Sequence, residues 1–308
     1  TLSLMLNFSK SKKEISSLEI TVSPACSKLC DYCPQTEYIT NYKNKFSKED
    51  KVLKLTTLKE VSKNISKSTL IKWTGFTEPL DCKEFDVSVQ YLFEQGYKQQ
   101  ISTTLLGREN SQNYYLNNLE KFYEHTLHLP DNEKLMKGKF DENYKKFVEN
   151  VIIKLHEKNI EFNIFLIGNN YHPIIQTAIE KLVNRYELKD KVIIAKYLNT
   201  RAAAINPKKF GLKQTAKNTS VEGGYFCSYQ RLNQGVLLPN GKVSLCCQDY
   251  GLEAIIGDLK INSIDEIYNS IEKNEDLRNK FTEGNFSPCK RCEHYSPLER
   301  KSTSSRKE

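Results

Sequence analysis

The stretch that decides the fold is LEITVSPACSKLCDYCP, residues 18–34. Its first five residues alternate apolar and polar side chains, which is typical of a β-strand. The loop that follows carries Cys26, Cys30 and Cys33 at the spacing C-x3-C-x2-C. Three thiols within eight residues, directly after a strand, make this loop the first candidate functional site.

The three thiolates of this loop suit an iron–sulfur cluster. They can bind three irons of a [4Fe–4S] cubane and leave the fourth iron open to a substrate or cofactor. The alternatives are a zinc knuckle and reduced core cysteines. Zinc usually takes a fourth nearby Cys or His to close a tetrahedron, and none lies near residues 26–33 in the sequence. The spacing therefore favours the cluster.

Outward from this loop, the first two thirds of the chain alternate β-rich runs with helical periodicities. Six runs predict strands: 18–22, 70–73, 100–105, 126–129, 162–167 and 192–194. Apolar stripes at helical spacing lie between them, the clearest over residues 144–155. This order predicts parallel βαβ units in an α/β fold. Periodicity alone leaves an open doubly wound sheet and a partial barrel as alternatives.

The pattern changes after residue 205. Asn240-Gly241 between two apolar runs predicts a β-hairpin, because this pair tolerates the positive φ of a primed turn. Ser263 and Glu266 form a capping-box pattern that predicts the start of a helix. We therefore expect an N-terminal extension (1–16), an α/β core (17–205), a smaller C-terminal domain (206–297) and a disordered tail (298–308).

Composition narrows the classes of protein. The 308 residues are 38% hydrophobic and 27% charged, which is ordinary for a globular protein. No apolar run approaches the roughly 18–20 residues that cross a bilayer. The net charge is +8, but the lysines are scattered among acidic residues, which is typical of a solvated surface rather than of a nucleic-acid interface. We expect neither membrane nor nucleic-acid binding.

The nine cysteines are clustered rather than spread. Eight fall within residues 26–33 and 227–292, and only Cys82, which we interpret as a buried filler, lies between the two groups. A secreted disulfide scaffold usually spreads an even number of cysteines through a short chain. Clustering at ligand spacing without a secretion signal indicates metal binding in a reducing compartment, so we expect a cytoplasmic location.

The first cysteine motif, with the aromatic Tyr32 just before its last cysteine, resembles that of the radical S-adenosylmethionine (SAM) superfamily. The resemblance covers the α/β half and implies a partial (β/α)6 TIM-like barrel. It implies that Cys26, Cys30 and Cys33 hold a [4Fe–4S] cluster whose open iron binds SAM. Reduction by a donor such as flavodoxin or ferredoxin is then expected to give a 5′-deoxyadenosyl radical that abstracts a hydrogen atom.

A second match follows the second predicted strand. Gly75, Phe76, Thr77 and Glu78, followed by proline, are similar to the family's GGEP segment, whose backbone and Glu receive the methionine amino group of SAM. Gly permits close backbone approach, and an acid suits an ammonium group. Phe76 and Thr77 stand before Glu78 where that segment has its second glycine, so the sequence departs from the double glycine here. The alternative is an ordinary strand-to-helix turn.

Further contacts are implied at the ends of later strands. The resemblance suggests Thr104, His128 and Asp131 as ribose or substrate contacts, although Thr104 is also an ordinary strand residue. After the sixth strand, Arg201 lies where such enzymes commonly place an Arg facing the substrate. Its guanidinium suits a phosphate, a carboxylate or a pair of hydroxyls. An interdomain salt bridge is the alternative.

The second cysteine group resembles the SPASM extension of radical SAM enzymes. Cys227 precedes Gly241 and Cys246 at the family spacing, and Cys289 and Cys292 form a C-x2-C pair. The full SPASM domain carries further cysteines, so this arrangement resembles the shorter twitch form, which implies one auxiliary [4Fe–4S] cluster held by these four residues. A zinc ribbon is the alternative.

Cys247 stands next to the predicted ligand Cys246, and both cannot comfortably serve one cluster. The glycine spacing selects Cys246. Cys247 is then a buried structural thiol, an alternative ligand, or a hydrogen-atom donor to a substrate radical, as in family members that epimerise sugars or peptides.

These features predict a radical SAM oxidoreductase or epimerase acting on a small, carbohydrate-like substrate. The auxiliary cluster would accept an electron or position the substrate. About sixteen residues precede the first strand, too few for a leader-peptide-binding domain of ordinary size. That expectation favours a small molecule over the alternative, a peptide-modifying maturase of ribosomally made peptides. A non-catalytic zinc or iron–sulfur binding module is the alternative of another class.

Overall fold

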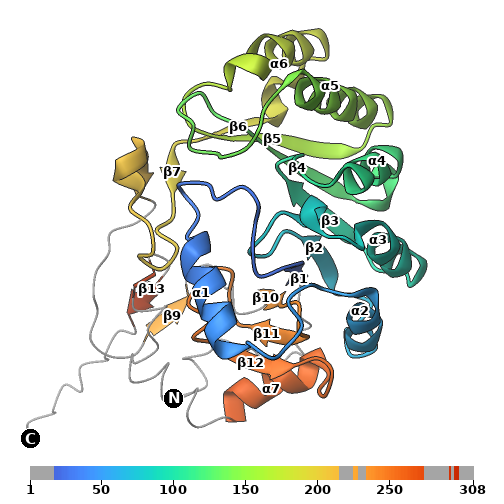
Figure 1. The fold of residues 1–308 in the computed structure, drawn as a ribbon, viewed down its shortest axis with the longest axis vertical. Helices are drawn as coiled ribbons and strands as arrows, with labels where there is room; N and C mark the ends of the chain where they lie inside the picture. The colour runs from blue at the N-terminus through green and yellow to red at the C-terminus, as the bar shows by residue number, and fades with distance from the viewer. Residues whose placement is uncertain (1–16, 215–224, 228–233, 274–290, 293–294, 298–308) are drawn as a thin grey trace, which may run out of the picture.

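The structure is a computed structural model that describes residues 17–214, 225–227, 234–273, 291–292 and 295–297. Its centre is a nine-stranded sheet in the order β12-β11-β10-β1-β2-β3-β4-β5-β6 (Figure 1). The strands of this sheet are β1 (Ser17–Ile20), β2 (Leu70–Trp73), β3 (Gln99–Thr103), β4 (Glu124–Leu129), β5 (Glu161–Ile167), β6 (Val192–Ala195), β10 (Gln234–Leu237), β11 (Lys242–Ser244) and β12 (Ile255–Asp258).

The first six strands run parallel, and each pairs with the next along the chain. The helices are α1 (Gln35–Lys45), α2 (Leu55–Ser62), α3 (Phe85–Glu94), α4 (Glu109–Asn117), α5 (Glu142–Glu157), α6 (Pro173–Arg185) and α7 (Ile264–Lys273). Helices α2 to α6 lie along one face of the sheet, and α1 lies on the opposite side (Figure 1). The six predicted strands and the βαβ order are confirmed.

Local sequence explains where these helices begin. The Asp141 side chain accepts hydrogen bonds from the Asn143 and Tyr144 amides, both at 3.1 Å, which satisfies two free donors at the start of α5. Ser263 and Glu266 exchange the side-chain to backbone hydrogen bonds of a capping box, at 2.8 and 3.2 Å. The predicted start of α7 is therefore confirmed.

Short elements complete the chain. The 3-10 helices are η2 (Pro79–Asp81), η3 (Leu119–Lys121), η4 (Leu188–Lys191) and η5 (Pro207–Phe210). Two small sheets join β7 (Tyr197–Leu198) to β8 (Lys213–Gln214), and β9 (Tyr225–Cys227) to β13 (Tyr295–Pro297). No helix in the described part of the chain has the length and apolar character needed to span a membrane.

The C-terminal part extends the sheet of the first half. Strand β10 pairs in parallel with β1, so that Leu18 lies opposite Gly235. The predicted hairpin is confirmed, because β10 and β11 are antiparallel and Gly241 has a φ of +92° in the turn between them. The boundary proposed at residue 206 therefore falls between strands of one sheet, and the division into domains stays a prediction.

Apolar side chains of the described residues form three buried clusters, and two of them pack helices against the sheet. The main core lies between the sheet and its outer helices and includes Trp73, whose Nε1 donates to Gln99 Oε1 at 2.8 Å. A second cluster packs α1 against β10 and the residues after β11. It comprises Tyr38, Tyr42, Phe46, Phe76, Val236, Leu238, Tyr250 and Leu252. Helix α1 and the C-terminal part thus share one apolar interface.

Candidate cluster and cofactor site

The cysteine loop lies between β1 and α1, at the carboxyl end of the parallel strands. Cys26, Cys30 and Cys33 are all free thiols, with Cys30 buried and the other two partly buried. The Cys33 amide donates to Cys30 O at 3.0 Å, which forms a tight turn around the last two thiols. Leu29 adopts a positive φ of 47°, so the backbone turns sharply between Cys26 and Cys30.

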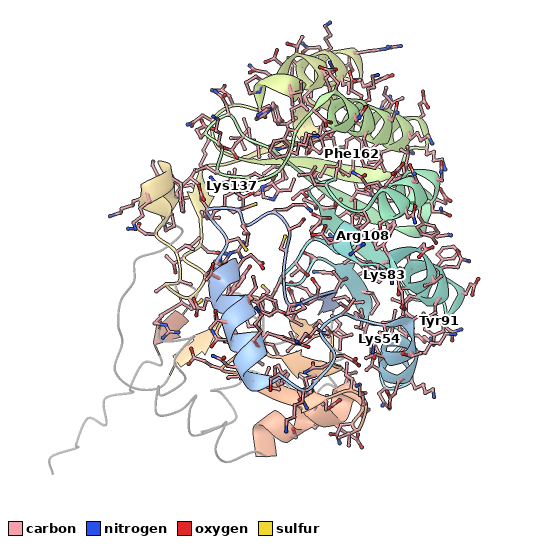
Figure 2. The ribbon with its side chains drawn as sticks, viewed as in Figure 1. Lys54, Lys83, Tyr91, Arg108, Lys137 and Phe162 are labelled. Atoms are coloured by element: carbon pink, nitrogen blue, oxygen red, sulfur yellow. The ribbon has the colours of Figure 1, made fainter. Side chains whose placement is uncertain are left out.

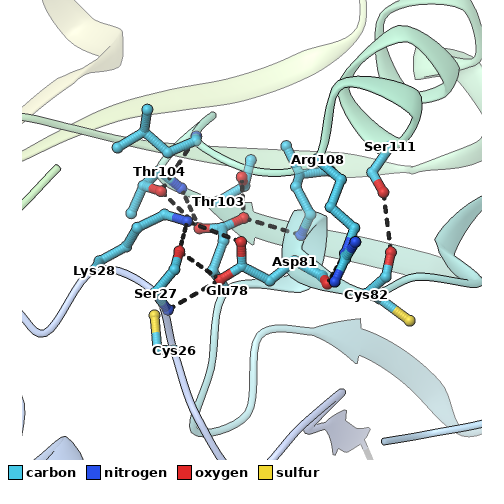
Figure 3. Close-up of polar contacts among 12 residues, drawn as sticks. Cys26, Ser27, Lys28, Glu78, Asp81, Cys82, Thr103, Thr104, Arg108 and Ser111 are labelled. Carbon is cyan, nitrogen blue, oxygen red and sulfur yellow. Dashed lines mark hydrogen bonds and ion pairs between the residues drawn. The ribbon is translucent and has the colours of Figure 1, made fainter. Parts of the chain in front are cut away.

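Ionic contacts hold this loop on two sides. Lys28 Nζ lies 2.9 Å from an Asp81 carboxylate oxygen, and Ser27 Oγ donates to the same side chain at 2.8 Å (Figure 3). Lys137, labelled in Figure 2, lies 2.8 Å from the Asp31 carboxylate. The loop after β1 is therefore fixed to η2 through Asp81 and to the segment after β4 through Lys137.

Burial favours the protonated form of two thiols in this loop, Cys26 and Cys30. Burial raises the pKa of the Cys26 thiol to about 12, although hydrogen bonds from the Lys28 and Glu78 amides act in the opposite direction. Burial also raises the pKa of Cys30, against a hydrogen bond from Tyr32. Metal binding must then release protons from both thiols.

The segment Gly75–Glu78 lies beside this loop, at the end of β2. Gly75 has a φ of +49°, and a Cβ there would lie 2.7 Å from Ile20 O, so only glycine fits. The Phe76 amide donates to Thr21 Oγ1 at 3.1 Å. Thr77 is buried, and its Oγ1 has no hydrogen-bond partner among the described residues. An orphaned hydroxyl at this position fits a bound polar group.

The carboxylate of Glu78 joins the ends of β2 and β3. It accepts from Thr103 Oγ1 at 2.5 Å and from the amide and Oγ1 of Thr104, both at 2.8 Å (Figure 3). Burial raises the pKa of Glu78, whereas Lys28 and the threonine hydrogen bonds lower it. The predicted SAM contacts of Gly75, Phe76, Thr77, Glu78 and Thr104 are therefore brought to one place, and their roles stay predictions.

His128 lies on β4, and Asp131 follows two residues after the end of that strand. The Tyr32 hydroxyl lies 3.4 Å from His128 Nε2, and the two rings stack with centroids 5.6 Å apart. Burial lowers the pKa of His128 to about 4, and the Arg201 charge acts in the same direction, so the imidazole is neutral near pH 7. Asp131 accepts from the Leu135 and Met136 amides, both at 2.8 Å. Its carboxylate thus holds the loop whose Leu135 carbonyl accepts from the cysteine loop.

Arg201 follows β7 and faces both cysteine groups. Burial lowers the pKa of its guanidinium, but Tyr250, Cys247 and Cys33 raise it above the usual value. Its Nε is buried without a hydrogen-bond partner in the described part of the chain. Arg201 and Ala202 have positive φ values of 51° and 55°, an uncommon backbone for residues other than glycine. The fold thus brings Cys33, Arg201 and Cys247 together.

This chain is similar to known proteins in part of its sequence and in its fold. Residues 227–293 match SPASM, an iron-sulfur cluster-binding domain. Native anSMEcpe with bound AdoMet is 16% identical, over 86% of this chain and 84% of that one, with a TM-score of 0.51. Streptococcus suis SuiB bound to S-adenosylmethionine is 12% identical, over 86% of this chain and 67% of that one, with a TM-score of 0.50.

The chain shares the fold of these AdoMet-bound proteins and carries a SPASM segment. The predicted partial barrel and its C-terminal extension are therefore confirmed. BtrN in complex with AdoMet and 2-DOIA is also similar, at 15% identity over 93% of this chain and 94% of that one, with a TM-score of 0.47. A comparison with curated proteins gave no match.

The SPASM segment is described in part. Cys246 and Cys247 follow β11, and Gln248 Nε2 donates to Cys247 Sγ at 3.7 Å. Cys292 is partly buried, and its neighbour Arg291 donates to Ala202 O at 3.2 Å. Cys289 and the side chain of Cys227 lie outside the described residues. The auxiliary ligand set Cys227, Cys246, Cys289 and Cys292 stays a prediction.

Within the described ranges, no three His, Cys, Asp or Glu side chains are grouped as around a single metal ion. This statement includes the three thiols of the first loop. A [4Fe–4S] cluster holds each thiolate on a separate iron, so its ligands lie farther apart than those of one tetrahedral zinc.

Two residues at this site were missed by sequence reasoning. Gln35 donates from Nε2 to Cys33 Sγ at 3.4 Å, and the Tyr250 hydroxyl lies 3.4 Å from the same sulfur. Gln35 stands two positions after the cysteine motif, which gave a weak signal. Tyr250 is 217 residues from Cys33, and nothing in the sequence pattern points to this contact.

Proposed function

We propose that this chain is a radical SAM enzyme that cleaves S-adenosylmethionine reductively and removes a hydrogen atom from a small substrate. One observation carries the proposal: the cysteine loop and the Gly75–Glu78 segment meet at the carboxyl end of the parallel sheet, with the Thr77 hydroxyl buried and unpartnered among the described residues. Ligands of parallel α/β folds bind at this end.

The donor set fits the proposed groups. Cys26, Cys30 and Cys33 would hold a [4Fe–4S] cluster, which together with SAM supplies a 5′-deoxyadenosyl radical when both are bound. The segment from Gly75 to Glu78 would receive the methionine part of SAM through backbone atoms, the Thr77 hydroxyl and the carboxylate. Thr104, His128 and Asp131 would orient the ribose. Neutral His128 can donate or accept one hydrogen bond to a hydroxyl.

We infer a small polar, carbohydrate-like substrate. The support lies beyond β7, where Asn199 Oδ1 and Arg201 Nε are buried with no hydrogen-bond partner in the described ranges. One is an acceptor and the other a donor, which suits a ligand with several hydroxyls. Cys247 lies near the Arg201 charge, where its S–H can return a hydrogen atom to a substrate radical. The outcome is then dehydrogenation or, through Cys247, epimerisation.

The test is anaerobic reconstitution of the full chain. About eight iron atoms per chain are expected for two clusters, with release of 5′-deoxyadenosine after reduction. Cys30→Ala should abolish this release. Cys82→Ala, which removes a thiol that is 1% exposed in the main core, is the matched control and should retain it. Stoichiometric zinc without SAM cleavage would instead support a non-catalytic binding module.

The substrate outcome is measured by mass spectrometry after turnover in D2O. A loss equal to two hydrogen atoms indicates dehydrogenation, and uptake of one solvent deuterium indicates epimerisation. Cys247→Ala should abolish deuterium uptake while SAM cleavage continues. Turnover of a peptide but not of sugars would replace the small-molecule proposal with that of a peptide maturase. Cys289→Ala should keep some SAM cleavage and lose product.

A further inference from the structure

The thiol of Cys33 contacts a residue from the far end of the chain. Tyr250 lies in the loop between β11 and β12, and its hydroxyl is 3.4 Å from Cys33 Sγ. In the metal-free protein either atom can donate this hydrogen bond. A cysteine that ligates iron has lost its proton, so the phenol must then be the donor.

Packing fixes the direction of this hydroxyl. The Tyr250 side chain is 5% exposed, and its ring packs edge-on against Phe76 and Tyr38, with centroids 4.9 and 6.4 Å away. Asp249 accepts from the Glu253 and Ala254 amides at 2.9 and 2.7 Å, which holds the loop in place. The position of the hydroxyl is therefore set by the C-terminal part of the chain.

A hydrogen bond to a ligand sulfur acts on the potential of the metal centre. The positive end of the O–H dipole stabilises the extra negative charge that reduction adds, and hydrogen bonds to sulfur are a known determinant of cluster potentials. The effect is large in a site with little water, because the local dielectric constant is low. Cys33 is partly buried and packs against the aromatic residues of this cluster.

We propose that Tyr250 is a positioning residue through which the C-terminal part of the chain raises the reduction potential of the cluster at Cys26, Cys30 and Cys33. This inference rests on the proposed function, since it takes these cysteines to be cluster ligands. Reduction of that cluster would then depend on whether the loop after β11 is seated, which ties the first step of the reaction to the SPASM segment.

The test compares two buried tyrosines that touch each other. Tyr38 packs against Tyr250 and Phe76 as well, but its hydroxyl has no hydrogen-bond partner in the part of the chain that the structure describes. Tyr250→Phe and Tyr38→Phe therefore each remove one buried hydroxyl from the same apolar cluster. The midpoint potential of the reconstituted first cluster is measured by redox titration with electron paramagnetic resonance.

Tyr250→Phe should shift this potential to a more negative value, and Tyr38→Phe should leave it unchanged. Equal shifts in both variants, or none in Tyr250→Phe, would overturn the inference. Should Tyr250→Phe fail to fold, 3-fluorotyrosine at position 250 keeps the ring and makes the hydroxyl a stronger donor, so the potential should become more positive. An unchanged value there would also overturn the inference. Loss of SAM cleavage or of the cluster in the unmodified chain would instead contradict the proposed function.

Discussion

At the scale of single residues, Gln35 connects three parts of the candidate site. Its Oε1 accepts from the Cys26 amide at 3.3 Å. Its Nε2 donates to Cys33 Sγ at 3.4 Å and also to the Phe76 carbonyl. A primary amide offers both an acceptor and two donors, which a carboxylate or an aliphatic side chain cannot supply. Gln35 is thus suited to hold the cysteine loop and the Gly75–Glu78 segment in register.

Gln35→Met should weaken this arrangement, because it keeps the side-chain length and leaves buried polar groups without partners. We expect a loss of about 2 kcal/mol in the free energy of unfolding of the metal-free protein, measured by urea denaturation, and lower iron content after reconstitution. Gln176→Met on α6, where the side-chain amide donates to Glu180 at 3.1 Å near the surface, is the control and should change stability little. Equal losses in the two variants would contradict this role.

The cysteine loop could be predicted as a candidate site because its spacing is local. Three thiols within one loop are visible in the sequence, and their chemistry follows from the residue type. Tyr250 could not be found in this way. Its contact to Cys33 depends on how α1 packs against the residues after β11, which only the tertiary structure determines.

At the scale of elements, the turn after β7 carries unusual backbone strain. Arg201, Ala202 and Ala203 have φ values of 51°, 55° and 67° in succession. The left-handed conformation costs roughly 1 kcal/mol or more for each residue with a Cβ. The Ala203 amide donates to Thr200 Oγ1 at 3.0 Å, and Arg291 holds the Ala202 carbonyl at 3.2 Å. These bonds offset part of the strain beside the buried Arg201 Nε.

This turn shows the limit of prediction by propensity. Parallel strands and amphipathic helices were found because their apolar periods, 2 and 3.6, are regular. A run of alanines predicts right-handed helix, since alanine has the highest helix propensity. Here the tertiary contacts of the turn override that preference, so the backbone conformation of Arg201 could not be predicted from the sequence.

Replacing Ala203 by glycine should stabilise the protein. Gly adopts a positive φ without a Cβ clash, so Ala203→Gly should raise the free energy of unfolding by about 0.5 kcal/mol after the entropy cost of glycine is included. Ala204→Gly in the same turn is the control, because Ala204 is not among the residues with positive φ. It should lower stability by a similar amount. Urea unfolding measures both, and a loss in Ala203→Gly would contradict the strain.

At the scale of the whole molecule, one sheet unites both parts of the chain. Strand β10 pairs in parallel with β1 although Gln234 lies more than two hundred residues after Ser17. Sequence analysis predicted the β10–β11 hairpin from its local turn, but not the partner of β10, because strand pairing across such a distance leaves no local signal. The sheet therefore places the loop of Tyr250 next to that of Cys33.

The pH dependence of the unfolding free energy tests whether His125 is held neutral in the interior of this sheet. His125 on β4 is 0% exposed, with Nε2 at 3.1 Å from the Leu119 carbonyl and Nδ1 at 2.7 Å from the Tyr115 hydroxyl. Because a carbonyl only accepts, Nε2 carries the proton and Nδ1 accepts from the phenol. Burial lowers the pKa of His125 to about 4, so the folded state binds fewer protons than the unfolded state between that value and the ordinary 6.5.

The contribution of His125 to stability should thus be complete above pH 6.5 and be lost as the pH falls toward 4, by up to about 3 kcal/mol. His128 adds a loss of the same sign, whereas the raised pKa of Asp249, about 6, acts in the opposite direction. His125→Gln separates these contributions, since the amide can donate and accept without titrating. The difference in unfolding free energy between the unmodified chain and the variant should shrink steadily from pH 7 to pH 4. Parallel stability curves would show that His125 is not held neutral by the fold.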